Sequence, residues 1–198
     1  QYHFIGKDIV YFHTLFWPAM LKFAGAPYKV PDNVFVHGFI TASGEKMSKS
    51  RGTGVSPDVY LDLGLDPEWL RYYIAAKLNA KVEDIDFNPD DFVARVNSDL
   101  IGKYVNIASR AGKILSDHFG GRIANLSTGT VGIQKFEQIS LEQKRQIPLH
   151  YKSGRFAAAV TQVVSHADKV NEFLQQQAPW KSVKDPANNA EKNHAHTD

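Results

Sequence analysis

Residues 2–40 read YHFIGKDIVYFHTLFWPAMLKFAGAPYKVPDNVFVHGFI, and this stretch decides the fold. The apolar run from Tyr2 to Gly6 ends at a glycine and predicts a short strand. Apolar residues then recur at helical spacing from Lys7 to Gly25, which predicts a helix, and the apolar run from Val34 to Ile40 predicts a second buried strand. This order indicates a right-handed crossover in a parallel sheet, so the chain begins inside an α/β domain of the nucleotide-binding type. Because two strands do not make a stable parallel sheet, we expect the amino-terminal half of that domain to lie outside this sequence.

Helical signals dominate after residue 55. Three predicted helix starts share a capping residue followed by proline at the first helical position. They are Ser56-Pro57, Asp66-Pro67 and Asn88-Pro89. Glycines end the first of these helices at Gly64 and the third, which carries an apolar stripe, at Gly120 and Gly121.

The remaining residues extend the helical pattern. A less regular stretch through Ile147 is expected to contain one more helix, and residues 154–177 predict a last long helix that stops before Pro179. From about residue 90 onward the sequence therefore predicts an all-helical bundle, with further helices expected outside this sequence. Residues 184–198 have almost no apolar content, which predicts a loosely ordered tail.

Composition excludes several classes of protein. The chain has 198 residues, 43% of them hydrophobic, and no cysteine, so a disulfide framework and a thiolate zinc site are both excluded within it. No apolar run reaches the roughly 18 residues that a membrane span needs, and the first ten residues lack the pattern of a signal peptide. We therefore expect a cytoplasmic protein with no membrane partner and no metal site of its own.

Charge is segregated along the chain although the net charge is only +2. Residues 1–54 carry six Lys or Arg against three Asp or Glu, residues 55–94 three against nine, and residues 95–183 twelve against six. Two basic regions that flank an acidic one suit two contacts with a long polyanion such as RNA, although the same charges also suit an ordinary soluble surface.

The stretch GEKMSKSRGTG (residues 44–54) concentrates cations, hydroxyl groups and glycines without apolar periodicity. One explanation is a solvated surface loop. The other is a mobile anion clamp, in which glycines allow close approach and lysine ammonium groups contact phosphate oxygens.

A family resemblance favours the clamp. KMSKS (residues 46–50), with GKDIVYFHTLFWPAML and FVHGFI before it, resembles the class I aminoacyl-tRNA synthetases, and specifically their bacterial-type methionyl-tRNA synthetase family. The resemblance continues through LRYYIAAKL, VNIASR and QAPW, so it covers residues 1–183.

The resemblance implies four parts. They are the C-terminal part of a Rossmann-type catalytic domain with the KMSKS loop (1–54), a connective helical region that contacts the tRNA stem (55–88), an incomplete anticodon-binding helical bundle (89–183) and the loose tail (184–198). Arg71 in the second part either approaches the tRNA stem or neutralises the acidic segment around it.

The resemblance also implies an ATP site. In the family the KMSKS loop closes over the triphosphate, so Lys46 and Lys49 would be catalytic and would hold phosphate oxygens, while Ser48 and Ser50 shape the loop. Phosphoryl and nucleotidyl transfers depend on such positioning and charge stabilisation. Lys49 is the expected transition-state contact.

Three further residues complete the implied ATP site. By resemblance, Gly6 permits close approach of the adenosine, Asp8 accepts from the ribose hydroxyls, and Ile40 reads adenine through its backbone. The alternative for Asp8 is an acid stabilised by a helix dipole. His37 is either a base contact or a core residue.

A methionine pocket is implied one helical turn on. Ile9, Phe12 and His13 fall at i, i+3 and i+4, and in the family this face surrounds the thioether. The alternative for His13, from its place on an apolar helix face alone, is a core histidine.

Anticodon contacts are implied in the helical half. Asn106 and Arg110 lie at i and i+4, so an amide and a guanidinium can bind one unpaired base edge. Pro179 and Trp180 follow the last long helix, where the indole offers a stacking face. The alternatives are a polar patch for Asn106 and Arg110 and a helix-end core anchor for Trp180.

The implied function is that of a methionine-tRNA ligase, which joins methionine to ATP with substrate-associated Mg²⁺ and transfers the methionyl group to tRNA(Met). The family's HIGH-type histidine pair is not in the sequence, so we expect this chain alone to be inactive. The alternatives are a class I synthetase for another apolar amino acid and a non-catalytic RNA-binding module of synthetase ancestry.

Overall fold

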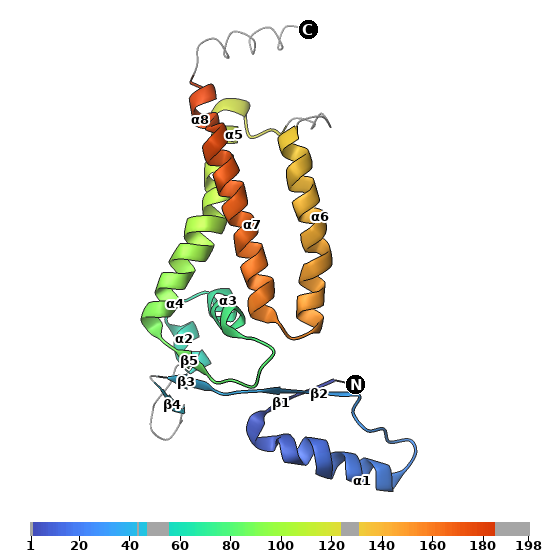
Figure 1. Ribbon diagram of the computed structural model, residues 1–198. Helices are drawn as coiled ribbons and strands as arrows, with labels where there is room; N and C mark the ends of the chain where they lie inside the picture. Colours follow the sequence, from blue (N-terminus) through green and yellow to red (C-terminus); the bar gives the residue numbers. More distant parts are fainter. Residues whose placement is uncertain (1, 43, 47–55, 124–130, 185–198) are drawn as a thin grey trace. The chain divides into compact units, whose positions relative to one another are not determined.

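The computed structural model describes residues 2–42, 44–46, 56–123 and 131–184. The chain divides into two compact units (Figure 1), of which unit 1 comprises Gln1–Phe92 with Tyr151–Ala158, and unit 2 comprises Val93–His150 with Ala159–Asp198. The strands of the described residues all precede residue 88, and helices follow, as predicted. The domain boundaries predicted from the resemblance stay predictions.

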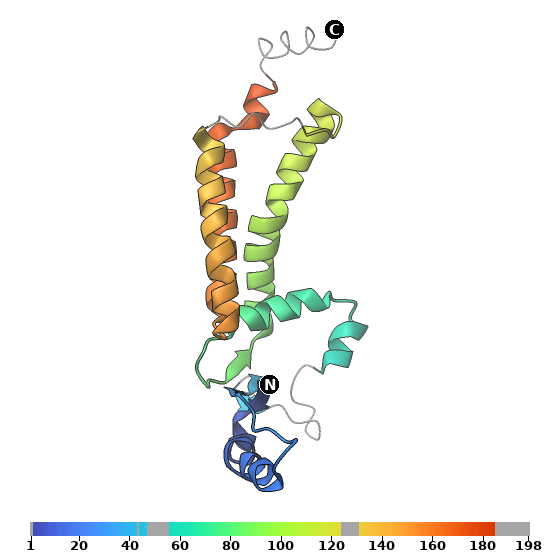
Figure 2. The same ribbon diagram turned by 90° about the vertical axis from the view of Figure 1, so that its right-hand side faces the viewer.

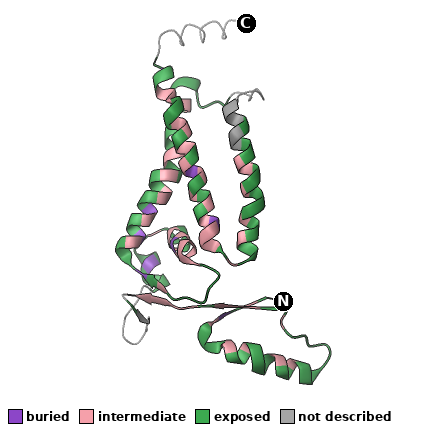
Figure 3. Ribbon diagram, in the orientation of Figure 1, coloured by how far each residue is buried: buried purple, intermediate pink, exposed green. Residues whose placement is uncertain are grey.

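Unit 1 opens with the predicted strand, helix and parallel strand. β1 (Tyr2–Gly6) and β2 (Asn33–His37) form a two-stranded parallel sheet, which confirms the predicted pairing. The helical segment between them is not uniform, because a 3-10 turn (Lys7–Ile9) and a π-helix (Phe12–Phe16) precede α1 (Trp17–Ala24). This segment is mostly exposed, as its green ribbon in Figure 3 shows. Its large apolar side chains share this exposure; Phe23, for example, is 94% exposed.

The single strand predicted from Val34 to Ile40 is wrong. β2 ends at His37, and β3 (Ile40–Ala42) belongs to a second sheet of order β4-β3-β5. In this sheet β4 (Glu45–Lys46) is antiparallel to β3, and β5 (Ile85–Phe87), which the sequence did not predict, is parallel to it. The break falls where Gly38 crosses the backbone of Glu83.

The three helix starts with proline are confirmed. α2 (Pro57–Asp62), α3 (Pro67–Lys77) and α4 (Pro89–Arg95) begin where predicted. Side chains cap two of them: the Asp66 carboxylate accepts from the Glu68 N–H at 2.9 Å, and Asn88 Oδ1 accepts from the Asp91 N–H at 3.0 Å. Ser56 occupies the cap position of α2 without a side-chain hydrogen bond.

An aromatic cluster forms the core of unit 1. Tyr73, which is completely buried, packs edge-on against Phe87 and Phe92, with ring centroids 5.6 and 5.5 Å away, and Tyr60 contacts Phe92 from α2. Aromatic pairs at this spacing add about 0.5–1.5 kcal/mol each to the free energy gained by burial. The cluster fixes β5 against α3 and α4 and so places the segment that precedes β5.

Unit 2 is helical. The α4 helix continues as a π-helix (Val96–Val105) and then as α5 (Asn106–Phe119), which ends at Gly120 in the left-handed conformation, as predicted. The one helix expected in the less regular stretch through Ile147 is confirmed as α6 (Val131–Lys152), a 22-residue helix that contains Pro148 and continues beyond Ile147.

The last long helix is confirmed as α7 (Phe156–Gln177), followed by the short α8 (Pro179–Ser182). Figures 1 and 2 both show α6 alongside α7, and Gln143 of α6 donates to the Gln162 carbonyl of α7 at 3.0 Å. The predicted tail lies outside the described residues apart from Lys184. No helix in the described part of the chain is both long and apolar enough to cross a membrane.

Candidate functional site

The first candidate site lies where β1 and β2 end. Gly6 and His37 are register partners at this edge. A Cβ atom on Gly6 would lie 2.9 Å from Oδ1 of Asp8 and 3.4 Å from the Phe39 ring, so a side chain at position 6 would displace the Asp8 carboxylate. Glycine thus keeps an exposed carboxylate beside the backbone at the carboxyl edge of a parallel sheet, where open α/β folds bind ligands. His37 is exposed, which excludes a core role for it.

Asp84 joins this edge to the break between the two sheets. Its Oδ1 accepts from the Phe39 N–H at 2.8 Å, and Lys7 Nζ lies 2.8 Å from both of its carboxylate oxygens. The same ammonium group stands 5.1 Å from the centroid of the Phe39 ring. Because Lys7 directly follows Gly6, these contacts tie the turn after β1 to the start of β3.

Asp86 holds the hairpin that leads into the KMSKS segment. A single oxygen, Oδ1, accepts from the Thr41 hydroxyl and from the Gly44 N–H, both at 2.8 Å. These two donors hold the pKa of Asp86 below its ordinary value of 3.8, with the Gly44 hydrogen bond as the larger cause. The φ of Gly44 is +75°, which side chains rarely adopt.

The predicted ATP-site residues are only partly described. Ile40 starts β3, and the next residue, Thr41, pairs with Lys46 across the hairpin. The structure describes the backbone of Lys46 within β4, whereas Ser48, Lys49 and Ser50 lie outside the described residues.

The predicted methionine-site residues lie on non-α helical turns. Ile9 ends the 3-10 turn, and Phe12 and His13 belong to the π-helix, so the α-helical spacing used to group them does not apply. Ile9 and Phe12 are exposed. His13 Nδ1 lies 3.0 Å from the Ile9 carbonyl oxygen, which requires a proton on Nδ1, and its ring contacts that of His3. His13 is therefore half-buried with a local partner and is not a core histidine.

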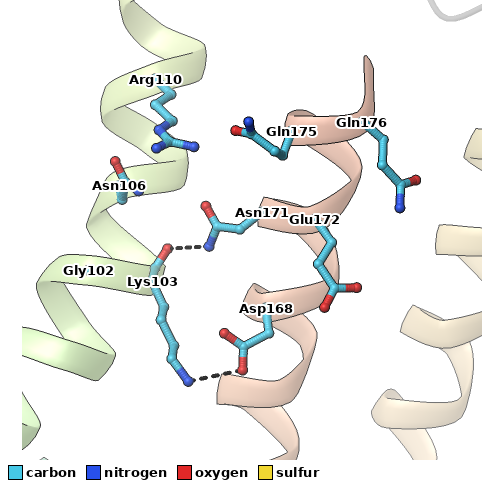
Figure 4. Close-up of a pocket in the computed structure, with 9 residues that line it drawn as sticks. All are labelled: Gly102, Lys103, Asn106, Arg110, Asp168, Asn171, Glu172, Gln175 and Gln176. Atoms are coloured by element: carbon cyan, nitrogen blue, oxygen red, sulfur yellow. Dashed lines mark hydrogen bonds and ion pairs between the residues drawn. The ribbon is translucent and has the colours of Figure 1, made fainter. Parts of the chain in front are cut away.

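The second candidate site lies in unit 2. Arg110 stands over the Trp180 ring, with the guanidinium carbon 5.8 Å from the centroid, which is the range of a cation–π contact. Asn106, one turn before Arg110 on α5, shares with it a hollow of about 590 Å³ between α5 and α7 (Figure 4). Arg110 and Trp180 also line a second hollow of about 460 Å³. The structure thus brings Asn106, Arg110 and Trp180 together, and Pro179 starts the short helix that carries Trp180.

One wall of the larger hollow is fixed by polar contacts that the sequence did not predict. Lys103 Nζ pairs with the Asp168 carboxylate at 3.0 Å, and Asn171 Nδ2 donates to the Lys103 carbonyl at 3.0 Å (Figure 4). The result is an amide, a guanidinium and an indole on fixed helices, which can hydrogen-bond to an unpaired base and stack on it.

Metal ligands do not gather in either site. Across residues 2–42, 44–46, 56–123 and 131–184, no three His, Asp or Glu side chains lie close enough together to hold a metal ion.

Arg71, for which the sequence left two roles open, forms an ion pair with Glu68 on its own helix.

Comparison with known proteins gives one family match that includes residues of both candidate sites. The family model for class I tRNA synthetases (M) matches residues 1–112. The chain belongs to the class I (M) tRNA synthetases. The match includes the KMSKS segment and extends to Asn106 and Arg110.

Two curated relatives of this class I synthetase chain are both named methionine–tRNA ligase. The chain is 57% identical over 192 residues to a methionine–tRNA ligase of Janthinobacterium sp. (strain Marseille) and 56% identical over 191 residues to one of Methylibium petroleiphilum. Each match covers 96% of this chain and 27% of the relative, so the chain spans about a quarter of the length of these curated relatives.

Solved structures show the same family. The synthetase chain matches Mycobacterium tuberculosis methionyl-tRNA synthetase bound by methionyl-adenylate with a TM-score of 0.83 and 27% identity, over 94% of this chain and 36% of that one. A second structure of that enzyme with methionyl-adenylate matches with a TM-score of 0.82 and 28% identity, over 93% and 35% of the two chains.

Sequence reasoning missed the residues that support the sites. Asp84 and Asp86 lie in DIDFNPDDF (residues 84–92), for which the sequence analysis predicts no strand, although Ile85–Phe87 form β5. The alternation of acidic and apolar residues in Asp84-Ile85-Asp86-Phe87 is the signal that could have found them.

Proposed function

We propose that this chain is part of a methionine–tRNA ligase. Methionine would be activated by ATP to methionyl-adenylate with release of pyrophosphate, and the methionyl group would then pass to the terminal ribose of tRNA(Met). Supporting this are relatives of that name at 56–57% identity and solved neighbours that hold methionyl-adenylate. In this proposal β1, α1 and β2 form a strand–helix–strand unit of a Rossmann-type domain.

The ATP-binding part is assigned to unit 1. Gly6 and the adjacent Asp8 carboxylate would receive the adenosine ribose, and the backbone of Ile40 would face the adenine. Lys46, Ser48 and Lys49 would act on the triphosphate, where preorganised cations stabilise the charge that develops as the methionine carboxylate attacks the α-phosphate. Mg²⁺ would arrive with ATP, because the described residues offer it no ligand set of their own.

Methionine recognition is assigned to the helical segment after β1. Ile9 and Phe12 are exposed and can cover a thioether, for which a sulfur-to-ring contact contributes about 0.3–1.5 kcal/mol. His13 would orient the amino acid through Nε2, because Nδ1 is engaged by the Ile9 carbonyl.

Anticodon recognition is assigned to unit 2. Asn106 and Arg110 would hydrogen-bond to an anticodon base, and Trp180 would stack on it next to Pro179. The observation that carries the whole proposal is the placement of Arg110 over Trp180 beside Asn106, in a chain that also carries KMSKS after a parallel strand pair. A nucleotide site alone would suit many enzymes, whereas this combination suits a tRNA ligase.

The experiment is methionine-dependent exchange between ATP and pyrophosphate in the full-length protein that carries this chain. We expect exchange with methionine to exceed exchange with leucine, isoleucine and valine. Lys49→Ala should lower kcat by about 10²–10³-fold, which is the usual effect of losing one preorganised donor.

The matched control is Lys22→Ala, which removes an exposed lysine from α1. It should leave exchange unchanged. Preference for another amino acid would assign the chain to a different class I synthetase, and tRNA binding without any exchange would favour a non-catalytic RNA-binding module.

A further inference from the structure

Two carboxylates on one strand edge contact both segments that flank the nucleotide site of unit 1. Asp84 directly precedes β5 and Asp86 is its middle residue, so the two carboxylates, two residues apart around Ile85, lie on the same side of this extended segment. β5 pairs in parallel with β3 from Ile40 to Ala42, which brings these carboxylates to the chain segment that links the two sheets.

Asp84 acts on the amino-terminal side of β3. It accepts from the Phe39 N–H, and the Ile85 N–H donates to the Phe39 carbonyl at 2.8 Å, so Phe39 is held at both of its backbone polar groups. The Asp84 carboxylate also binds the ammonium group of Lys7, and Lys7 lies in the turn between Gly6 and Asp8. The turn after β1 is therefore fixed to the same carboxylate as the start of β3.

Asp86 acts on the carboxyl-terminal side of β3. It binds the Thr41 hydroxyl and the Gly44 N–H, which lie on either side of the turn into β4. Gly44 is the first residue of GEKMSKSRGTG, and its positive φ is a conformation that side chains rarely adopt. The start of the KMSKS segment thus has one described side-chain anchor, and that anchor stands two residues from the one that holds the Gly6–Asp8 turn.

We propose that Asp84 and Asp86 are positioning residues for the adenylation reaction, which set the Gly6–Asp8 turn and the Gly44 turn that precedes KMSKS at a fixed spacing through β5. This inference rests on the proposed function, because it assigns these two segments to opposite sides of bound ATP. Neither residue contacts substrate. Their effect passes through backbone hydrogen bonds, and a displacement of about 1 Å at a reacting group can cost about 10²-fold in rate.

The test measures kcat and KM for ATP and for methionine in pyrophosphate exchange by the full-length protein. Asp86→Ala removes the acceptor of two hydrogen bonds and should lower kcat/KM for ATP by about 10²-fold, with KM for methionine unchanged. Asp86→Asn keeps an acceptor oxygen, so its kcat/KM for ATP should lie within about tenfold of that of the unsubstituted protein. Asp84→Ala should resemble Asp86→Ala.

The matched control is Asp90→Asn, which removes an equal charge from the same acidic segment. Asp90 is exposed, and its side chain makes no hydrogen bond or ion pair with any residue that the structure describes, so full exchange activity is expected. Hydrogen exchange of the Gly44 amide gives a readout besides activity. It should accelerate in Asp86→Ala and not in Asp90→Asn.

Two results would overturn the inference while leaving the proposed function intact. One is an active unsubstituted protein in which Asp84→Ala and Asp86→Ala both keep full kcat/KM for ATP. The other is a loss of activity in Asp86→Ala that follows the unfolded fraction in thermal melts and is not restored by Asp86→Asn. An unsubstituted protein without methionine-dependent exchange would overturn both the inference and the proposed function.

Discussion

At the scale of single residues, Gly38 decides how the chain passes from one sheet of unit 1 to the next. A Cβ atom at this position would lie 2.1 Å from the carbonyl oxygen of Glu83 and 2.8 Å from Oδ1 of Asp84. The first of these is a backbone atom, so it cannot move aside as a flexible side chain can. Glycine is required here by close approach between two backbone segments.

We predict that Gly38→Ala lowers the free energy of unfolding by about 1–3 kcal/mol, because the added methyl group must push β3 and the segment before β5 apart. Gly112→Ala is the control. It lies inside α5 with no atom within 4 Å of the added Cβ, and it should raise stability by about 0.5–1 kcal/mol. Urea unfolding of both variants measures the difference, and equal effects would contradict the contact.

At the scale of secondary-structure elements, Lys77 joins α3 to β5 and α4. Its ammonium group lies 2.7 Å from the Asp91 carboxylate, donates to the Asp86 carbonyl at 3.1 Å and contacts the hydroxyl of the buried Tyr73. Burial by itself would lower the pKa of Lys77, but the hydrogen bonds and charges of Asp91 and Tyr73 outweigh it and raise the pKa above its ordinary value of 10.5. The charged form is therefore the one that stabilises unit 1.

We predict that Lys77→Met lowers the free energy of unfolding by about 1.5–3 kcal/mol near neutral pH, the usual value of a hydrogen bond to a charged group. Because the folded pKa is the higher one, this contribution is complete below the unfolded value of 10.5 and disappears as pH rises through the folded pKa. Unfolding free energies of both proteins between pH 7 and 11 provide the measurement. A difference that grows above pH 10.5 would contradict the assignment.

At the scale of the whole molecule, the proposed anticodon site lies in the part of the chain with the largest excess of basic residues. Residues 95–183 carry twelve Lys or Arg against six Asp or Glu, and this part of the chain contains Arg110 and Trp180. Contacts to phosphates release counterions and therefore weaken with salt, whereas stacking and base-edge hydrogen bonds carry sequence preference.

We predict that Arg110→Ala and Trp180→Ala each weaken binding of an anticodon stem-loop by about 1–3 kcal/mol and reduce the preference for the CAU triplet. Titrations at several salt concentrations, with matched and altered triplets, separate the two effects. Lys169→Ala, an exposed lysine of α7, is the control and should change at most the salt dependence. Loss of affinity without loss of preference in the Arg110 and Trp180 variants would indicate phosphate binding only.

Local signals in the sequence determined the ends of most elements. A capping residue, a proline at the first helical position or a glycine stop acts within one helical turn, so the starts of α2, α3 and α4 and the end of α5 followed from neighbouring residues alone. The spacing of Asn106 and Arg110 is likewise local, whereas the pairing of β1 with β2 was predicted from the order strand, helix, strand.

Tertiary structure alone decided the features that depend on residues far apart in the chain. The split between β2 and β3, the strand β5 and the anchors Asp84 and Asp86 all rest on hydrogen bonds between distant residues, such as Asp84 with Phe39 and Asp86 with Thr41, each pair 45 apart, for which periodicity carries no information. The contact of Arg110 with Trp180 likewise required α7 to return beside α5. Sequence sets the local conformation because its causes are local, whereas the pairing of distant segments is settled only when the folded chain brings their donors and acceptors together.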